Sequence, residues 1–263
     1  MRLYYEIAVR SFRRATIYRS AYIAGILTNA FFGALRCFVY SALFAAGGSV
    51  AGFTLQQTIS YTWVTQSLIS VGAGWIIGTE LIATIRTGDV VTDLMRPWNF
   101  YAYWLSRSLG ERCFNLLLRG TLTYVIGILY FGAYIPSALE LAAFALSISL
   151  SLLISFAFSF SINLTAFWLI DNSGIIGMAN LILGFFSGFW MPIAFLPAPL
   201  QAIAHALPFQ AITSLPAQVF LGQIHGAELG ATLLLQVVWA VVLTVTGWLI
   251  LHAASQKVVT QGG

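Results

Sequence analysis

Long apolar runs alternate with short polar stretches along this chain, and the runs have the length of membrane-spanning helices. A bilayer core requires ~20 apolar residues in helical form. We predict six transmembrane helices, at residues 22–44, 54–77, 113–133, 137–170, 175–195 and 229–254. The pattern therefore predicts an all-α polytopic membrane protein with a single domain over residues 1–263.

The first twenty residues show a different pattern, that of a basic amphipathic helix. One side carries the apolar residues Leu3, Tyr4, Ile7, Ala8, Phe12 and Ala15. The other side carries most of the charges, Arg2, Glu6, Arg10, Arg13 and Arg14. A helix of this kind lies in the headgroup region with its cations toward anionic lipid. The segment is too long and too regular for the n-region of a signal peptide, so we predict an interfacial helix over residues 1–20.

A polar island interrupts the apolar pattern at residues 78–97, with the sequence GTELIATIRTGDVVTDLMRP. Thr79 suits the N-cap of one short helix, and Gly88 suits its C-terminus. Asp89 can cap a second short helix, which stops at Arg96 because a following proline disfavours helical geometry. The predicted apolar faces are Leu81, Ile82 and Ile85 on the first helix, and Val90, Val91, Leu94 and Met95 on the second.

The island also carries the charges that could contact another protein. The candidate docking residues are Glu80, Arg86, Gly88, Asp89, Asp93 and Arg96. From chemistry alone two interpretations stay open, a docking surface and a solvated loop with two helical turns.

Two predicted spans contain polar groups that lipid alone would not satisfy. Arg36 lies inside the first span, where a charge costs about 2.5–3.5 kcal/mol, so it must snorkel, pair or face a polar interior. The second span has a polar face that includes Gln57 and Ser60, and part of it should face protein or a water-lined path. We therefore take Gln57, Ser60 and Arg36 as candidates for a translocation path. The serines of the fourth span are interpreted as close-packing positions rather than a barrel strand.

Proline repeatedly interrupts the apolar segment 196–224, at Pro197, Pro199, Pro208 and Pro216. One straight helix cannot contain so many prolines. We predict two short helices that enter the outer half of the membrane and return, which requires that protein or a water-filled cavity cover the non-helical backbone.

Composition supports the membrane assignment and excludes several functions. The chain is 59% hydrophobic and 8% charged, whereas soluble domains carry roughly 25% charged residues. The net charge of +4 is no indication of nucleic-acid binding. Its cations cluster in the N-terminal helix, residues 78–112 and the C-terminal tail, so these should be cytoplasmic, with both termini on that side.

The motifs of several enzyme classes are missing from the sequence. The only lysine is Lys257, so no nucleotide-binding P-loop exists. His205, His225 and His252 form no zinc motif, and there is no Gly-x-Ser-x-Gly stretch. We expect no catalytic site, metal or cofactor on this chain.

Two stretches resemble the type-2 permease family of ATP-binding-cassette (ABC) exporters. One is FSGFWMPIAFLPAPLQAIAHALPFQAITSLPAQVFLGQ, from Phe186, and the other is IRTGDVVTDLMRPWNFYAYWLSRSLGE, from Ile85. The resemblance covers essentially the whole chain. It implies that residues 79–97 form the coupling helix between spans two and three, seated in a separate ATPase subunit.

The same resemblance implies the rest of the assembly. Two ATPase copies would bind ATP and Mg, and a second permease subunit, identical or homologous, would complete a transporter in a bacterial inner membrane. Drugs, lipids and antibiotics are the substrate types that it suggests. Two alternatives stay open, a secondary carrier or channel-like protein without an ATPase and, ranked last, a membrane-embedded lipid-modifying enzyme.

Overall fold

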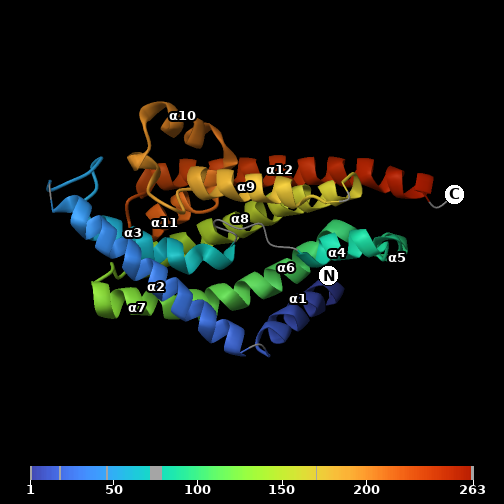
Figure 1. Ribbon diagram of the computed structural model, residues 1–263, viewed down its shortest axis with the longest axis horizontal. Helices are drawn as coiled ribbons and strands as arrows, with labels where there is room; N and C mark the ends of the chain where they lie inside the picture. Colours follow the sequence, from blue (N-terminus) through green and yellow to red (C-terminus); the bar gives the residue numbers. More distant parts are fainter. Residues whose placement is uncertain (1, 18, 46, 72–78, 170, 262–263) are drawn as a thin grey trace.

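The structure, a computed structural model, describes residues 2–17, 19–45, 47–71, 79–169 and 171–261. These residues are helical apart from turns and loops, as predicted (Figure 1). The α-helices are α1 (Arg2–Ala15), α2 (Arg19–Phe44), α3 (Leu55–Ser67), α4 (Thr79–Thr87), α5 (Val90–Met95), α6 (Phe100–Phe114), α7 (Thr121–Phe131), α8 (Ala138–Asn163), α9 (Ser173–Phe186), α10 (Ala198–Ala206), α11 (Ser214–Phe220) and α12 (Gly226–Gln261). The shorter elements are the 3-10 helices η1 (Leu68–Val71), η3 (Leu164–Phe167), η4 (Ile193–Phe195) and η5 (Pro208–Ala211), and the π-helix η2 (Asn115–Gly120).

Four stretches of the described residues are long and apolar enough to cross a membrane. They are Ser20–Phe44, Phe100–Phe131, Ala138–Phe167 and Gly226–Lys257. They correspond to the first, third, fourth and sixth predicted spans, so the chain is a multi-pass membrane protein.

The third span begins at Phe100 rather than at the predicted Cys113. Asn99 caps the helix there, because its side-chain oxygen accepts a hydrogen bond from the Ala102 N–H at 2.8 Å. Tyr101, Tyr103 and Trp104 thus lie in the first turns of this helix, and Trp98 precedes it. This shift places Arg112 well inside the span.

The second and fifth predicted spans differ from expectation. α3 and η1 cover residues 55–71, and the predicted remainder of that span, residues 72–77, lies outside the described residues. α9 ends at Phe186, so the predicted end at Phe195 is wrong. The chain turns there because the Trp190 N–H bonds back to the Gly184 carbonyl. At 14 residues, α9 is shorter than the ~20 of a typical span, and the six-span topology stays a prediction.

The N-terminal helix α1 lies along α6 (Figure 1). Gly110 of α6 makes this approach possible, since a Cβ atom there would lie only 2.1 Å from the carbonyl oxygen of Ala8. The Phe12 ring packs edge-on against Phe114 at 5.4 Å. Tyr5 on the opposite side is 68% exposed. An amphipathic α1 with one side packed and one side free agrees with the predicted interfacial helix, whose position in the headgroups stays a prediction.

Polar residues inside the helices serve packing, as the sequence suggested. Most of the predicted polar face of α3 is buried against protein, and Ser60, Thr62, Thr65 and Gln66 are all at most 2% exposed, whereas Gln57 at the start of the helix is exposed. Ser147 and Ser151 of α8 are fully buried against α12 and contact Gln236. Gln236 also donates to the Ala211 carbonyl at 2.9 Å, so one amide joins α8, α12 and η5.

Short helices replace one straight span in the proline-rich segment, as predicted. α10 and α11 contain 9 and 7 residues, and the 3-10 turn η5 separates them. Figure 1 shows α10 projecting beside α12, whereas α11 lies inward near α8 and α3. Their depth in a membrane stays a prediction.

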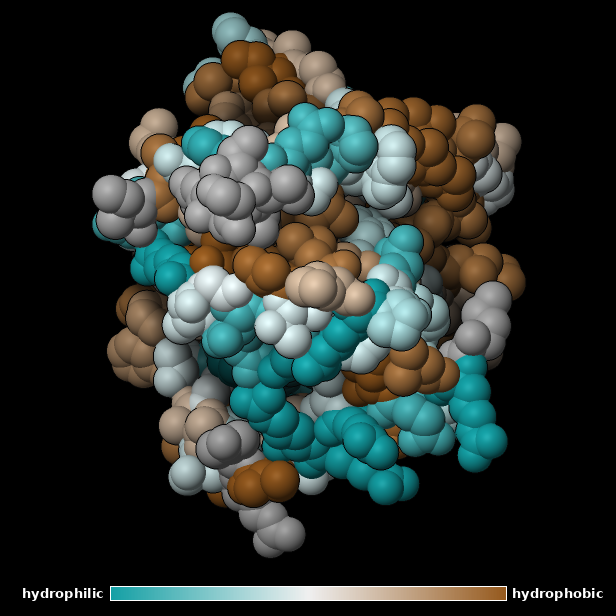
Figure 2. Space-filling model, turned by 90° about the vertical axis from the view of Figure 1, so that its right-hand side faces the viewer, coloured by the Kyte–Doolittle hydropathy of each residue, from teal (hydrophilic) through white to brown (hydrophobic). Residues whose placement is uncertain are grey.

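The two ends of the molecule differ in character. α1, α4, α5 and the C-terminal end of α12 lie toward one end, while the end of α7 and α10 lie toward the other (Figure 1). Figure 2, which views the first of these ends, shows hydrophilic side chains gathered across it, with hydrophobic surface at the flanks. We call this the polar end.

Candidate docking surface and the charged interior

The polar island folds into two short helices joined at Gly88, and we call this unit the α4–α5 hairpin. Gly88 has a φ of +81°, a left-handed conformation in which glycine is favoured. Its N–H bonds to the Ile85 carbonyl at 3.3 Å. No atom lies within 4 Å of the position that a Cβ would occupy. The predicted glycine turn is confirmed, and backbone conformation rather than space selects glycine here.

One side of the hairpin is buried in the body of the protein. Leu81 and Val90 are each 2% exposed, and both pack into a cluster with Phe100 and Phe160. The buried face of α4 agrees with the prediction. The face predicted for α5 is wrong in part, because Val91 is 41% and Met95 81% exposed. A helix of 6 residues presents only one narrow side to the protein, so its other apolar residues point outward.

Glu80 forms an ion pair with each of two arginines from other helices. Its carboxylate accepts a hydrogen bond from Arg14 of α1 at 2.8 Å and also contacts Arg107 of α6. All three side chains are partly exposed. Glu80 was a candidate for pairing with another protein, but in this structure it ties α4 to α1 and α6.

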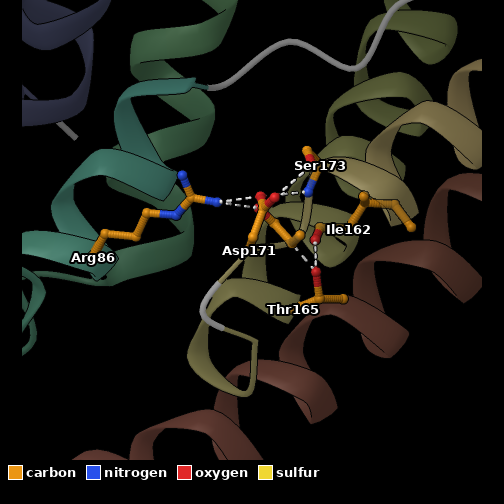
Figure 3. Close-up of polar contacts among 6 residues, drawn as sticks. Arg86, Ile162, Thr165, Asp171 and Ser173 are labelled. Atoms are coloured by element: carbon orange, nitrogen blue, oxygen red, sulfur yellow. Dashed lines mark hydrogen bonds and ion pairs between the residues drawn. The ribbon is translucent and has the colours of Figure 1, made fainter.

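Arg86 connects α4 to the turn that precedes α9. Its guanidinium donates to Asp171 at 3.0 Å and to Asn172 at 3.2 Å, and Figure 3 shows the side chain reaching across to this turn. Hydrogen bonds from the Ser173 hydroxyl and N–H, together with Arg86, hold the pKa of Asp171 below its ordinary value. The Asp171 carboxylate therefore stays ionised at neutral pH, and the pair with Arg86 persists.

Of the remaining candidate charges, Asp89 and Arg96 are exposed, whereas the Asp93 side chain is only 16% exposed. Asp89 makes no cap hydrogen bond to α5, so that prediction is wrong, and it accepts a hydrogen bond from Thr87 instead. Asp93 and Arg96 approach each other at 3.7 Å. Arg96 has extended backbone, as its position before proline predicted, and lies over the Trp98 ring at 4.8 Å. α4 begins at Thr79 itself, one residue before the predicted start.

The three candidates for a translocation path each make contacts of their own, and the path itself stays a prediction. Gln57 completes a capping box with Thr54 at the start of α3. Ser60 is 2% exposed and accepts a hydrogen bond from the Tyr134 N–H. Arg36 donates to the Phe189 carbonyl at 3.0 Å and lies over the Phe189 ring, so it holds the turn after α9.

Sequence reasoning missed Arg112 as a functional candidate. Its side chain is buried between α6, η1 and α8, where it contacts the Val71 carbonyl and Ser155. The predicted span began at Cys113, which placed Arg112 outside it. The Asn99 cap and the continuous helical pattern from Phe100 were the signals that could have found it. Among the described residues no group of His, Cys, Asp and Glu is arranged to hold a metal.

These features define a multi-pass helical membrane protein with an anchored hairpin at its polar end. A family model described as "ABC-2 family transporter protein" matches residues 31–262. The chain therefore belongs to the ABC-2 transporter family, as a membrane permease component. A comparison with curated protein sequences finds no match.

Proposed function

We propose that this chain is the transmembrane subunit of an ATP-driven exporter, and that a separate ATPase docks on the α4–α5 hairpin. The observation that carries the proposal is the exposed outer face of the hairpin. Met95 is 81% exposed there, between the charged residues Asp93 and Arg96. An exposed apolar anchor with a polar rim is typical of a protein contact surface.

The anchoring of the hairpin supports a role in transmitting movement. A docked subunit can shift this chain only through contacts that differ in free energy between two states. Glu80 ties α4 to α1 and α6, and Arg86 ties it to the turn before α9. A displacement of the hairpin therefore acts on the long helix of the third span and on α9. In this proposal Glu80 and Arg86 transmit the movement of the hairpin to the other helices. The residues that contact the ATPase are Asp89, Asp93, Arg96 and Met95.

The proposed complex has the composition that the family resemblance implies. Two ATPase copies bind ATP and Mg, and a second permease subunit, identical or homologous, completes the transporter. The polar end with both termini faces the cytoplasm, and the complex lies in a bacterial inner membrane. Its substrate is hydrophobic or amphipathic and moves outward.

Co-purification tests this proposal. The chain carries an affinity tag and is extracted in mild detergent from cells that also produce any ATPase encoded in an adjacent reading frame. The proposal expects the ATPase to co-elute and transport into inverted vesicles to require hydrolysable ATP. A chain that purifies alone, with transport that persists without ATP and stops when the proton gradient is dissipated, would support the secondary carrier instead.

A further inference from the structure

Arg112 is the one charged side chain among the described residues that is buried, at 1% exposure. It lies 12 residues into the span that begins at Phe100, which corresponds to ~18 Å along the helix. The π-helix η2 starts three residues later, at Asn115, and π-helical segments are frequent at functional sites. This position lies deep inside the helical bundle.

The guanidinium of Arg112 is only half satisfied. Its Nη1 donates to the Val71 carbonyl at 2.8 Å and to the Ser155 hydroxyl at 2.7 Å. Its Nε and Nη2 are buried and have no hydrogen-bond partner among the described residues. These two atoms form one edge of the guanidinium, and such an edge binds a carboxylate or a phosphate in bidentate fashion.

Among the described residues no carboxylate forms an ion pair with Arg112, and the neighbouring Glu111 acts on its charge only from a distance. The sequence contains 8 Asp and Glu residues, all of them within the described ranges. Their ion pairs are with Arg14, Arg86, Arg96 and Arg107. A buried cation without a directly paired counter-ion is costly, and an anion bound at the free edge would offset that cost.

We propose that Arg112 and Ser155 bind the anionic head group, a phosphate or carboxylate, of an amphipathic substrate when α6 and α8 move apart during transport. This inference rests on the proposed export function and adds the substrate class. Apolar side chains next to the site form one cluster, with Val71, Leu109, Leu116 and Leu152 as members. They suit an attached hydrocarbon tail, so the site selects an amphiphile over a free anion.

In this structure the site is closed, because the Val71 carbonyl occupies the place that the anion would take. The anion replaces the Val71 carbonyl and fills the free edge, so it binds the open form better than the closed one. A ligand with such a preference shifts the population toward the open form. The side chain of Ser155, which now donates to the Val71 carbonyl at 2.5 Å, is released to donate to the ligand.

Thermal unfolding of the full chain in dodecyl maltoside tests the inference without any ATPase, so its outcome is separate from that of the docking proposal. Three additives are compared at equal concentration: dodecyl phosphate, dodecyltrimethylammonium and inorganic phosphate. We expect dodecyl phosphate alone to raise the melting temperature, with saturation. An equal rise with the cationic amphiphile, or no rise at all, would overturn the inference. A rise with inorganic phosphate alone would overturn the substrate class.

Variants then locate the effect. Arg112→Gln should weaken the apparent affinity for dodecyl phosphate by ~10-fold or more, as expected for the loss of charge-assisted hydrogen bonds. Arg10→Gln, a change at an exposed arginine of α1, should leave it unchanged. Arg112→Lys keeps the charge but not the two-donor edge, so it should give an intermediate affinity for dodecyl phosphate. If Arg112→Gln does not fold, the affinity of this lysine variant alone tests the site. Wild-type affinity in both Arg112 variants would contradict the site.

Discussion

The carboxylate of Glu80 on α4 accepts a hydrogen bond from the guanidinium of Arg14 on α1 at 2.8 Å. Arg107 of α6 contacts the same carboxylate. Exposed pairs of this kind contribute only about 0–1 kcal/mol to folding. The contact therefore contributes little to folding stability. Its effect is to hold α4 in place against α1 and α6.

Glu80→Arg should lower ATPase retention and transport several-fold while leaving protein abundance in the membrane near normal. The change places a third cation beside Arg14 and Arg107, and like charges at this distance repel, which displaces α4. A second substitution, Arg14→Glu, restores one opposite-charge pair and should recover part of both activities. ATPase co-elution and vesicle transport are measured at equal membrane abundance. Identical defects in the single and the double variant would show that Glu80 acts through another contact.

The turn at Gly88 gives a second prediction. Gly88→Val should disrupt the hairpin, because a left-handed conformation costs ordinary residues roughly 1–2 kcal/mol, and a β-branched residue more. Gly88→Asn is the matched control, since asparagine tolerates this conformation better. We expect ATPase co-elution to fall for the valine variant and to persist for the asparagine variant. Equal retention by both variants would contradict the importance of the turn.

Sequence reasoning found the hairpin but not its surroundings. The apolar spacing of Leu81 and Ile82, the glycine at position 88 and the proline after Arg96 are local signals, and each was confirmed. The partners of Glu80 come from α1 and α6, and periodicity within α4 holds no information on such distant contacts. The exposure of Met95 depends on how α5 sits against the body of the protein, which its own sequence could not show.

The burial of Arg112 and the end of α9 were missed for related reasons. Hydropathy alone starts the third span where charges stop, but a helix can continue through charges that the protein interior covers. α9 remains apolar beyond Phe186, so composition predicted a longer helix, whereas a backbone turn between Gly184 and Trp190 ends it. Both errors arose because the structure there depends on contacts between separate segments of the chain, which the sequence of a single helix does not reveal.

The buried Gln236 network should determine the stability of the outer segment. Gln236→Leu removes the acceptor of the Ser147 hydroxyl, whereas the Ala211 carbonyl and the Ser151 hydroxyl still bond to each other at 2.8 Å. One buried group left unsatisfied costs ~1–3 kcal/mol. Gln256→Leu, at an exposed position of the same helix, is the control. Thermal unfolding in detergent should show a clear drop for the first variant alone. Equal melting temperatures would mean that the network contributes little.

The orientation of the chain can be checked by cysteine labelling of intact cells. Cys37 and Cys113 are first replaced by alanine, and single cysteines are introduced at Thr87, Gly48 and Gln261. The one-sided distribution of cations predicts that an impermeant reagent reaches Gly48 but neither of the other two. Labelling of the Thr87 position from outside would overturn the predicted topology and remove the hairpin from the reach of an ATPase.

Cross-linking from Met95 tests the central claim most directly. In the background without native cysteines, a photo-reactive maleimide is attached to a cysteine at Met95 or at Leu139. Both positions are 81% exposed. Met95 ends α5, and Leu139 lies in the first turn of α8, just after α7. α5 and α7 lie at opposite ends of the molecule (Figure 1). Docking on the α4–α5 hairpin predicts a covalent product with the ATPase from Met95 and none from Leu139. No product from Met95, or equal products from both positions, would contradict it.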